Sequence, residues 1–140
     1  MTTQSQINSI ANREFGQTST PNTIPATYYV GLLLASPNPD GSGVVEVSTG
    51  GTAYARQALV NSKSALSTAV NGAVSNISAI NFPAATASWG TITDVGIFSA
   101  LTGGTLLYSS PQAVQKAFDV GDVAFFDVGD IKWTVQNVTT

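Results

Sequence analysis

Residues 84–111 read AATASWGTITDVGIFSALTGGTLLYSSP, and this stretch decides the fold. Its β-branched and aromatic residues are concentrated in Thr91–Ser99, a composition that favours a pleated, half-buried strand. Gly103 and Gly104 readily adopt the positive φ angles of a tight turn, so we expect Thr105–Ser109 to return antiparallel to the first strand. Apolar residues fall on both faces, Val95 and Ile97 on one and Ile92 and Phe98 on the other. The pattern predicts a central hairpin that is covered on both sides.

The segments that flank this hairpin predict further antiparallel strands. Tyr28–Ala35 is an uninterrupted apolar run between two prolines and is expected to be a buried strand. The other predicted strands are Val44–Val47, Thr52–Val60, Ile77–Phe82, Ala124–Val128 and Ile131–Gln136. Asn71-Gly72 suits a two-residue hairpin turn, a long loop fits Asn61–Ser78 equally well, and Gln112–Phe118 has no clear pattern. We expect an all-β fold, an antiparallel β-sandwich or flattened barrel of about seven to eight strands.

Residues 1–24 differ from the predicted β-domain at 25–140 and indicate a short N-terminal helix followed by an extended arm. Apolar residues recur at helical spacing at Ile7, Ile10, Ala11 and Phe15. Thr3 and Gln6 fit a capping box at the start of the helix, and Gly16 is suited to end it. The helix either covers its own β-domain or reaches a neighbouring subunit. In the second arrangement Ile7, Ile10 and Phe15 are the candidate assembly contacts.

The composition argues against several classes of function. The chain has 140 residues, enough for one domain, and contains no Cys and no His, so thiol chemistry and histidine-based catalysis are excluded. Only 9% of its residues are charged and its net charge is −3, which gives no basis for binding nucleic acid. No apolar run approaches a membrane span, and the first residues lack the features of a signal peptide. We expect no membrane partner, no cofactor, no enzymatic activity, and synthesis in the cytoplasm of the producing cell.

Two groups of charged residues are candidates for an ion pair and for a metal site. Glu46 and Arg56 lie on neighbouring predicted strands and are expected to form a structural ion pair; Arg56 as a ligand for a carboxylate or sugar is the alternative. A repeated Asp-Val-Gly-Asp supplies four carboxylates, at Asp119, Asp122, Asp127 and Asp130. Carboxylates are what a hard cation such as Ca²⁺ needs, but the spacing does not match an EF-hand loop. We interpret the repeats as two turns at the ends of a short strand and predict no metal site.

Aromatic residues raise the alternative of a sugar-stacking surface. The residues concerned are Tyr28, Tyr29, Tyr54, Trp89, Tyr108 and Trp133. Trp133 alternates with Ile131 and Val135, and Tyr108 lies in the central hairpin. Most of the six are therefore interpreted as packing of the core or of the sheet edges.

Several of these segments also resemble a known family. WGTITDVGIF at 89–98, the Gly-Gly turn and the LLY return at 106–108 are similar to small tailed-bacteriophage virion proteins, many of them labelled phage tail fibre protein. The resemblance covers roughly residues 5–135 and includes PATYYVGL at 25–32, EVS at 46–48, YARQA at 54–58 and INFP at 80–83. Asp94 and Ser99 depart from the family pattern, in which a His and an acidic residue are frequent at these positions.

The resemblance implies a non-enzymatic structural protein of the virion. Since the chain is one compact domain without a fibrous repeat, we predict a capsid decoration (cement) protein on the outer surface of the head that bridges neighbouring capsomers. Its partners would be the major capsid protein and copies of itself, for example as a trimer. The alternative is a tail-fibre or baseplate component, whose partners would be other tail proteins or a host-surface glycan. A free carbohydrate-binding module is a third interpretation.

Overall fold

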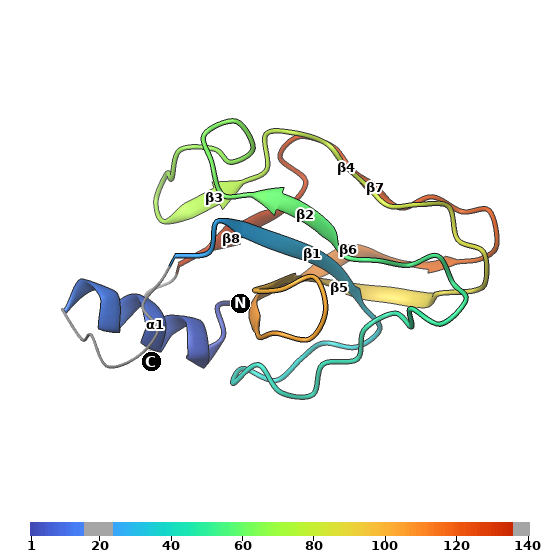
Figure 1. The fold of residues 1–140 in the computed structure, drawn as a ribbon, viewed down its shortest axis with the longest axis horizontal. Helices are drawn as coiled ribbons and strands as arrows, with labels where there is room; N and C mark the ends of the chain where they lie inside the picture. Colours follow the sequence, from blue (N-terminus) through green and yellow to red (C-terminus); the bar gives the residue numbers. More distant parts are fainter. Residues whose placement is uncertain (16–23, 136–140) are drawn as a thin grey trace.

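The structure is a computed structural model that describes residues 1–15 and 24–135. Its elements are α1 (Gln4–Glu14), β1 (Thr27–Leu33), β2 (Gln57–Val60), β3 (Ala73–Ser75), β4 (Ile80–Asn81), β5 (Gly90–Phe98), β6 (Leu106–Phe118), β7 (Phe125–Phe126) and β8 (Lys132–Thr134). One layer is a four-stranded sheet in the order β2-β1-β5-β6, and the other consists of the pairs β3-β8 and β4-β7 (Figure 1). All pairs are antiparallel and the sheets do not close on each other. The predicted β-sandwich is thus confirmed, and the flattened barrel is wrong.

The central hairpin consists of β5 and β6, and its turn is as predicted. Gly103 and Gly104 have φ angles of 61° and 69°, values that a residue with a Cβ rarely adopts. The return strand β6 is longer than the predicted Thr105–Ser109 and continues to Phe118. Residues 112–115 of β6 lie opposite Thr93 alone, so this part of the strand bulges out of the ladder. The bulge breaks the period-2 pattern, which explains why the sequence of Gln112–Phe118 was ambiguous.

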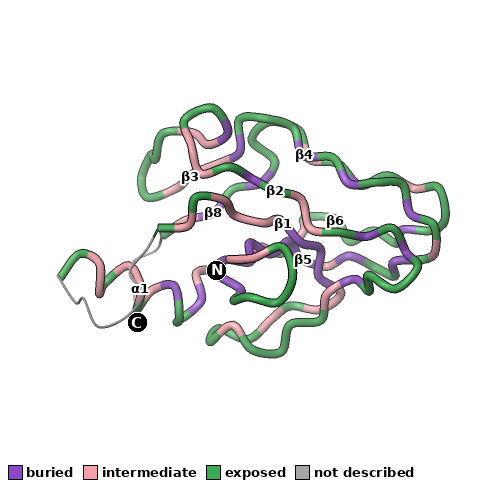
Figure 2. The backbone as a smooth tube through the Cα atoms, in the orientation of Figure 1, coloured by how far each residue is buried: buried purple, intermediate pink, exposed green. Residues whose placement is uncertain are grey.

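The main core lies between the two layers. Figure 2 shows the buried residues gathered along β1, β5 and the first part of β6, in agreement with their burial patterns. Ile92 packs in this core together with Val95 and Ile97, although the strand period had placed it on the Phe98 face. The register shift between Ile92 and Asp94 moves it to the other side. Phe98 packs on the opposite face in a small second cluster, so the hairpin is covered on both sides as expected.

Two predicted strands upstream of the hairpin are wrong in extent. Val44–Val47 is not a strand: it runs beside β1 through two backbone hydrogen bonds and one isolated bridge, between Leu33 and Glu46. Thr52–Val60 is a strand only from Gln57 onward. Ala53 has a φ of 61°, in the left-handed region, and this bend ends the extended backbone before Tyr54.

The strands of the second layer are also shorter than predicted. Ile77–Phe82 is reduced to β4, Ala124–Val128 to β7, and Ile131–Gln136 to β8, while Gln136 lies outside the described residues. Their flanking backbone groups bond to loops instead, as when Ile77 N–H donates to the carbonyl of Ala65. The Asn71-Gly72 turn is confirmed, since its two residues have φ angles of 52° and 76° and join a bridge between Val70 and Ala73.

The predicted helix is present as α1, but only half of its capping box forms. Thr3 is the N-cap, and its hydroxyl accepts a hydrogen bond from the Gln6 N–H at 3.4 Å. The Gln6 side chain does not return to Thr3; it donates to the Tyr108 hydroxyl at 3.1 Å. Gly16, the predicted end of the helix, and residues 17–23 of the predicted linker lie outside the described residues. Within the described part of the chain, no helix is long and apolar enough to cross a membrane.

Candidate functional site

The first turn of α1 is fixed to the edge strand β6. Thr3 N–H donates to the carbonyl of Leu107 at 2.9 Å, and its hydroxyl donates to the carbonyl of Leu106 at 2.9 Å. Thr2 forms a bridge with Tyr108 and bonds through its hydroxyl to the carbonyl of Thr134. Thr3 is 0% exposed. Residues 1–3, at the start of the predicted helical segment, therefore pair with the sheet.

The rest of α1 leads away from the sandwich. Figure 1 shows the helix extending beyond the end of the four-stranded sheet rather than lying over it. Of the three candidate assembly contacts, Ile7 and Ile10 are half-buried, and Phe15, at the end of the helix, is 82% exposed. The only helix residue that is fully buried is Gln6. The described part of the chain thus covers the apolar stripe of α1 in part at Ile7 and Ile10 and leaves Phe15 open.

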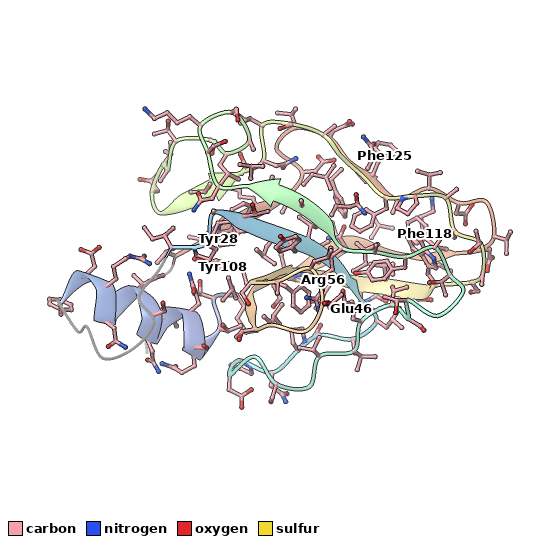
Figure 3. The ribbon with its side chains drawn as sticks, in the orientation of Figure 1. Tyr28, Glu46, Arg56, Tyr108, Phe118 and Phe125 are labelled. Atoms are coloured by element: carbon pink, nitrogen blue, oxygen red, sulfur yellow. The ribbon has the colours of Figure 1, made fainter. Side chains whose placement is uncertain are left out.

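Arg56 and Glu46 form the ion pair that the sequence analysis expected. The guanidinium binds the carboxylate through two nitrogens, with Nη2–Oε2 at 2.7 Å and Nε–Oε1 at 2.9 Å. Figure 3 shows Arg56 and Glu46 side by side, and the Tyr54 hydroxyl donates to the same carboxylate at 2.6 Å. Burial, and then this hydrogen bond, raise the pKa of Tyr54 well above its ordinary value. The arrangement is a partly buried network that joins the loops before and after the Ala53 bend.

The same guanidinium also holds the turn of the central hairpin. Its Nη1 donates to the carbonyls of Ala100 and Gly103, each at 2.7 Å, and its central carbon lies 3.5 Å from the centre of the Phe98 ring. Four hydrogen bonds from one guanidinium leave little capacity for an external ligand. The geometry supports a structural role for Arg56 over the alternative role in binding a carboxylate or sugar.

The four aspartates lie in two separate turns. Asp122 accepts a hydrogen bond from the backbone of Asp119 at 2.9 Å, and Asp130 accepts one from Asp127 at the same distance. In each turn the intervening glycine has a φ near 90°. Among residues 1–15 and 24–135, no three acidic side chains come close enough to hold a metal ion together. These aspartates are turn formers, as predicted.

The six aromatic residues do not form a surface row. Tyr54, Trp89, Tyr108 and Trp133 are buried in the core. Tyr28 and Tyr29 are half-buried and pack against the two clusters. Burial also raises the pKa of Tyr28 and of Tyr108 above their ordinary values. The sugar-stacking surface suggested by these six residues is not present.

A groove of about 420 Å³ opens between β6 and the edge formed by β7 and β8. Core side chains form its floor, and Phe125 and Phe126 form one wall. A smaller groove of about 190 Å³ continues past the same two rings. The polar residues around the larger groove are Ser109, Ser110, Gln112, Asp130 and Lys132. Phe125 lies on the side of the molecule away from α1 (Figure 3).

Sequence reasoning missed Phe125 as a surface aromatic. It is 58% exposed, whereas its neighbour Phe126 packs against the core. The sequence did contain a sign of this arrangement, because consecutive side chains of a strand point to opposite faces, so one ring of a Phe-Phe pair must point outward. The position of Gln112 could not be foreseen in the same way, because it depends on the bulge in β6.

The comparison with known families agrees with the resemblance in the sequence. No curated protein matches the chain. The profile of one family, described as Podophage GP4 fiber I protein gp80, matches residues 2–134, nearly the whole chain. The chain therefore belongs to the Gp80 family of phage structural proteins.

Proposed function

We propose that this chain is a non-enzymatic fibre subunit of a tailed-phage particle and that it attaches to its neighbours through α1. The observation that carries the proposal is the exposure of Phe15, 82%, at the end of a helix whose first turn is fixed to β6. Membership of a family described by a fibre protein supports the fibre assignment. The fixed first turn supports α1 as the attachment element, because a pre-ordered helix loses less conformational entropy on binding.

The chemistry of α1 suits a neutral, apolar contact. Burying Ile7, Ile10 and Phe15 would contribute roughly 1.5–3 kcal/mol per fully covered side chain, which is enough for attachment when several copies act together. The last turn carries Arg13 next to Glu14, whose charges cancel. The expected partner is therefore an apolar groove on another structural protein of the particle, or on a second copy of this chain.

A capsid decoration protein is the second candidate. The observation that favours it is that residues 1–15 and 24–135 form one compact sandwich without a fibrous repeat. Both functions use α1 as the attachment element, so they differ in the location of the protein in the particle and in its copy number, and not in the chemistry of the contact. Counting copies in purified particles separates them, because a decoration protein follows the number of capsomers and a fibre subunit follows the few attachment points of its fibre.

The experiment that tests attachment replaces Phe15. Phe15→Ser should keep the melting temperature of the full-length protein, because the ring contributes little to the fold, and should reduce binding to particles that lack the protein by at least about tenfold. Phe15→Leu should restore most of the binding. The matched control is Val120→Ser, which changes another highly exposed apolar residue. Unchanged binding of Phe15→Ser, or equal loss in the control, would show that α1 is not the attachment element.

A further inference from the structure

The groove between β6 and the β7–β8 edge has the size and the lining of a small-ligand site. Its volume of about 420 Å³ falls in the range of roughly 300–1,000 Å³ that ligand pockets occupy. It combines an apolar floor with polar groups at its rim. Ligand sites of proteins have this composition, in which apolar surface supplies affinity and a few polar groups fix orientation.

Phe125 gives the groove an open aromatic wall. Its side chain is 58% exposed and lines both the larger and the smaller groove. Within the larger groove Tyr108 and Trp133 are buried and Phe126 is partly buried, so Phe125 is the most exposed of its rings. An exposed aromatic ring at a concave site offers a flat apolar surface to a ligand that has an apolar face of its own.

Several polar side chains at the rim have unused hydrogen-bonding capacity. Among the described residues, the side chains of Gln112, Ser110 and Lys132 have no hydrogen-bond partner. Asp130 uses only Oδ2, which accepts from the backbone of Asp127. Together these groups offer an amide, a hydroxyl, an ammonium and a carboxylate oxygen toward one groove. A ligand rich in hydroxyl groups can donate to some of them and accept from others.

The charge of the rim selects among ligands of this kind. Asp130 and Lys132 carry opposite charges and lie on the same groove, so an ionic ligand gains no net attraction there. A neutral polyol with one apolar face satisfies every feature: the face packs on Phe125, and the hydroxyls bond to the rim. We propose that this groove is a binding site for a neutral saccharide unit, with Phe125 as the stacking residue and Gln112 as a polar contact.

The proposed site goes beyond the attachment function and does not depend on it. Phe125 lies on the side of the molecule away from α1 (Figure 3), and none of the candidate contacts Ile7, Ile10 and Phe15 lines the groove, although its floor reaches Tyr108, which Gln6 contacts. Because the two surfaces share no residue, each can be disabled alone. Loss of saccharide binding without loss of particle attachment, or the reverse, tells the two proposals apart.

The test is a titration of the isotope-labelled full-length protein with neutral methyl glycosides, followed by NMR. The panel contains methyl glucoside, galactoside, mannoside, rhamnoside and N-acetylglucosaminide. We expect at least one glycoside to shift the indole N–H of Trp133, which lines the groove, while the indole N–H of Trp89, bonded in the core to the carbonyl of Thr52, stays in place. A dissociation constant in the range of about 1–10 mM is expected for one unit.

Variants then locate the site. Phe125→Ala and Gln112→Ala should each raise the dissociation constant at least about tenfold, and the exposed control Val128→Ala should leave it unchanged. The side chains of Phe125 and Gln112 are at the surface, so both variants are expected to melt like the parent protein.

Three outcomes would overturn the proposal. The first is the absence of any shift with every glycoside at about 50 mM, well above the expected dissociation constant. The second is an unchanged titration in both groove variants. The third is a concentration-dependent dimer of the parent protein, seen by sedimentation, that Phe125→Ala converts to monomer, because the groove would then be covered by a second copy of the chain.

Discussion

Arg56 is the residue whose side chain joins the Glu46 loop to the turn of the central hairpin. It joins Glu46 on one loop to the carbonyls of the hairpin turn on another, and its guanidinium lies over Phe98. Lys cannot reproduce this set of contacts, because its ammonium is a single point and lacks the planar fork of the guanidinium. The ion pair is therefore specific for Arg at this position.

Replacing Arg56 should destabilise the fold strongly. We expect Arg56→Met to lower the free energy of unfolding by about 3 kcal/mol, because Glu46 loses its partner and two carbonyls of the turn lose theirs. Urea denaturation of the full-length protein measures the change. The double variant Arg56→Met with Glu46→Gln should recover part of the loss, since the unpaired carboxylate is then gone. A loss below about 1 kcal/mol in the single variant would mean that the pair behaves like an exposed one.

Single residues differ in how far their roles can be predicted from sequence. The ion pair of Glu46 and Arg56 was foreseen because a covered Arg needs a partner and few charged residues compete for it. Strand alternation indicates that one ring of the Phe125-Phe126 pair points outward, but it does not say which. The place of Gln112 at the groove could not be predicted, because it depends on how β6 loses its register against β5.

Among the elements, α1 and the three residues before it form one unit with the edge of β6. Thr3 caps the helix and at the same time bonds to β6 through its backbone and its hydroxyl. The edge of a sheet is a site where unpaired backbone groups attract other strands. Residues 1–3 cover that edge at Leu107–Ser109, so they protect the sheet as well as position the helix.

Deleting residues 1–3 should therefore cost stability, unlike the change at Phe15. The deletion removes the N-cap of α1 and the hydrogen bonds of Thr3 to Leu106 and Leu107, and we expect a loss of about 2–4 kcal/mol in the free energy of unfolding. Urea denaturation of the shortened chain and of Phe15→Ser, side by side, measures the difference. Equal stability of the shortened and the full chain would show that the pairing with β6 contributes nothing in solution.

The elements that sequence predicted best are those with local causes. The helix, the Gly103-Gly104 turn and the Asn71-Gly72 turn each follow from neighbouring residues, and all three are present. The strands of the second layer were predicted too long, because their length is set by which distant backbone groups they meet. Asn76 illustrates this. Its buried side chain donates a hydrogen bond to the carbonyl of Asp127 and accepts one from the N–H of Ile131, two residues that follow it by more than 50 positions.

For the molecule as a whole, tyrosine ionisation is expected to set the alkaline limit of stability. Burial raises the pKa of Tyr28, Tyr54 and Tyr108 above the ordinary value of 10.0. Above pH 10.0 the unfolded chain loses these protons while the folded chain keeps them. The unfolded state then binds fewer protons, so the free energy of unfolding falls as the pH rises.

Urea denaturation tests this expectation. The midpoint is measured at increasing alkaline pH, and tyrosinate absorbance is followed in parallel. The midpoint should begin to fall near pH 10.0, and ionisation of the buried tyrosines should coincide with unfolding. Tyr108→Phe should make the fall less steep, because one of the three groups is removed. A midpoint that is constant through this range, with tyrosines ionising in the folded protein, contradicts the assignment.

The pairing of Thr3 with β6 delays completion of the sheet until most of the chain has been translated. Thr3 bonds to Leu106, 103 residues later, and β1 likewise pairs with β5, which emerges late from the ribosome. At roughly 5–20 residues per second, the first residues wait about 5–20 s for their partner. The four-stranded sheet is therefore completed late, because β1 and residues 1–3 pair with strands that follow them by more than 60 residues. Slow codons between residues 3 and 106 would lengthen that wait.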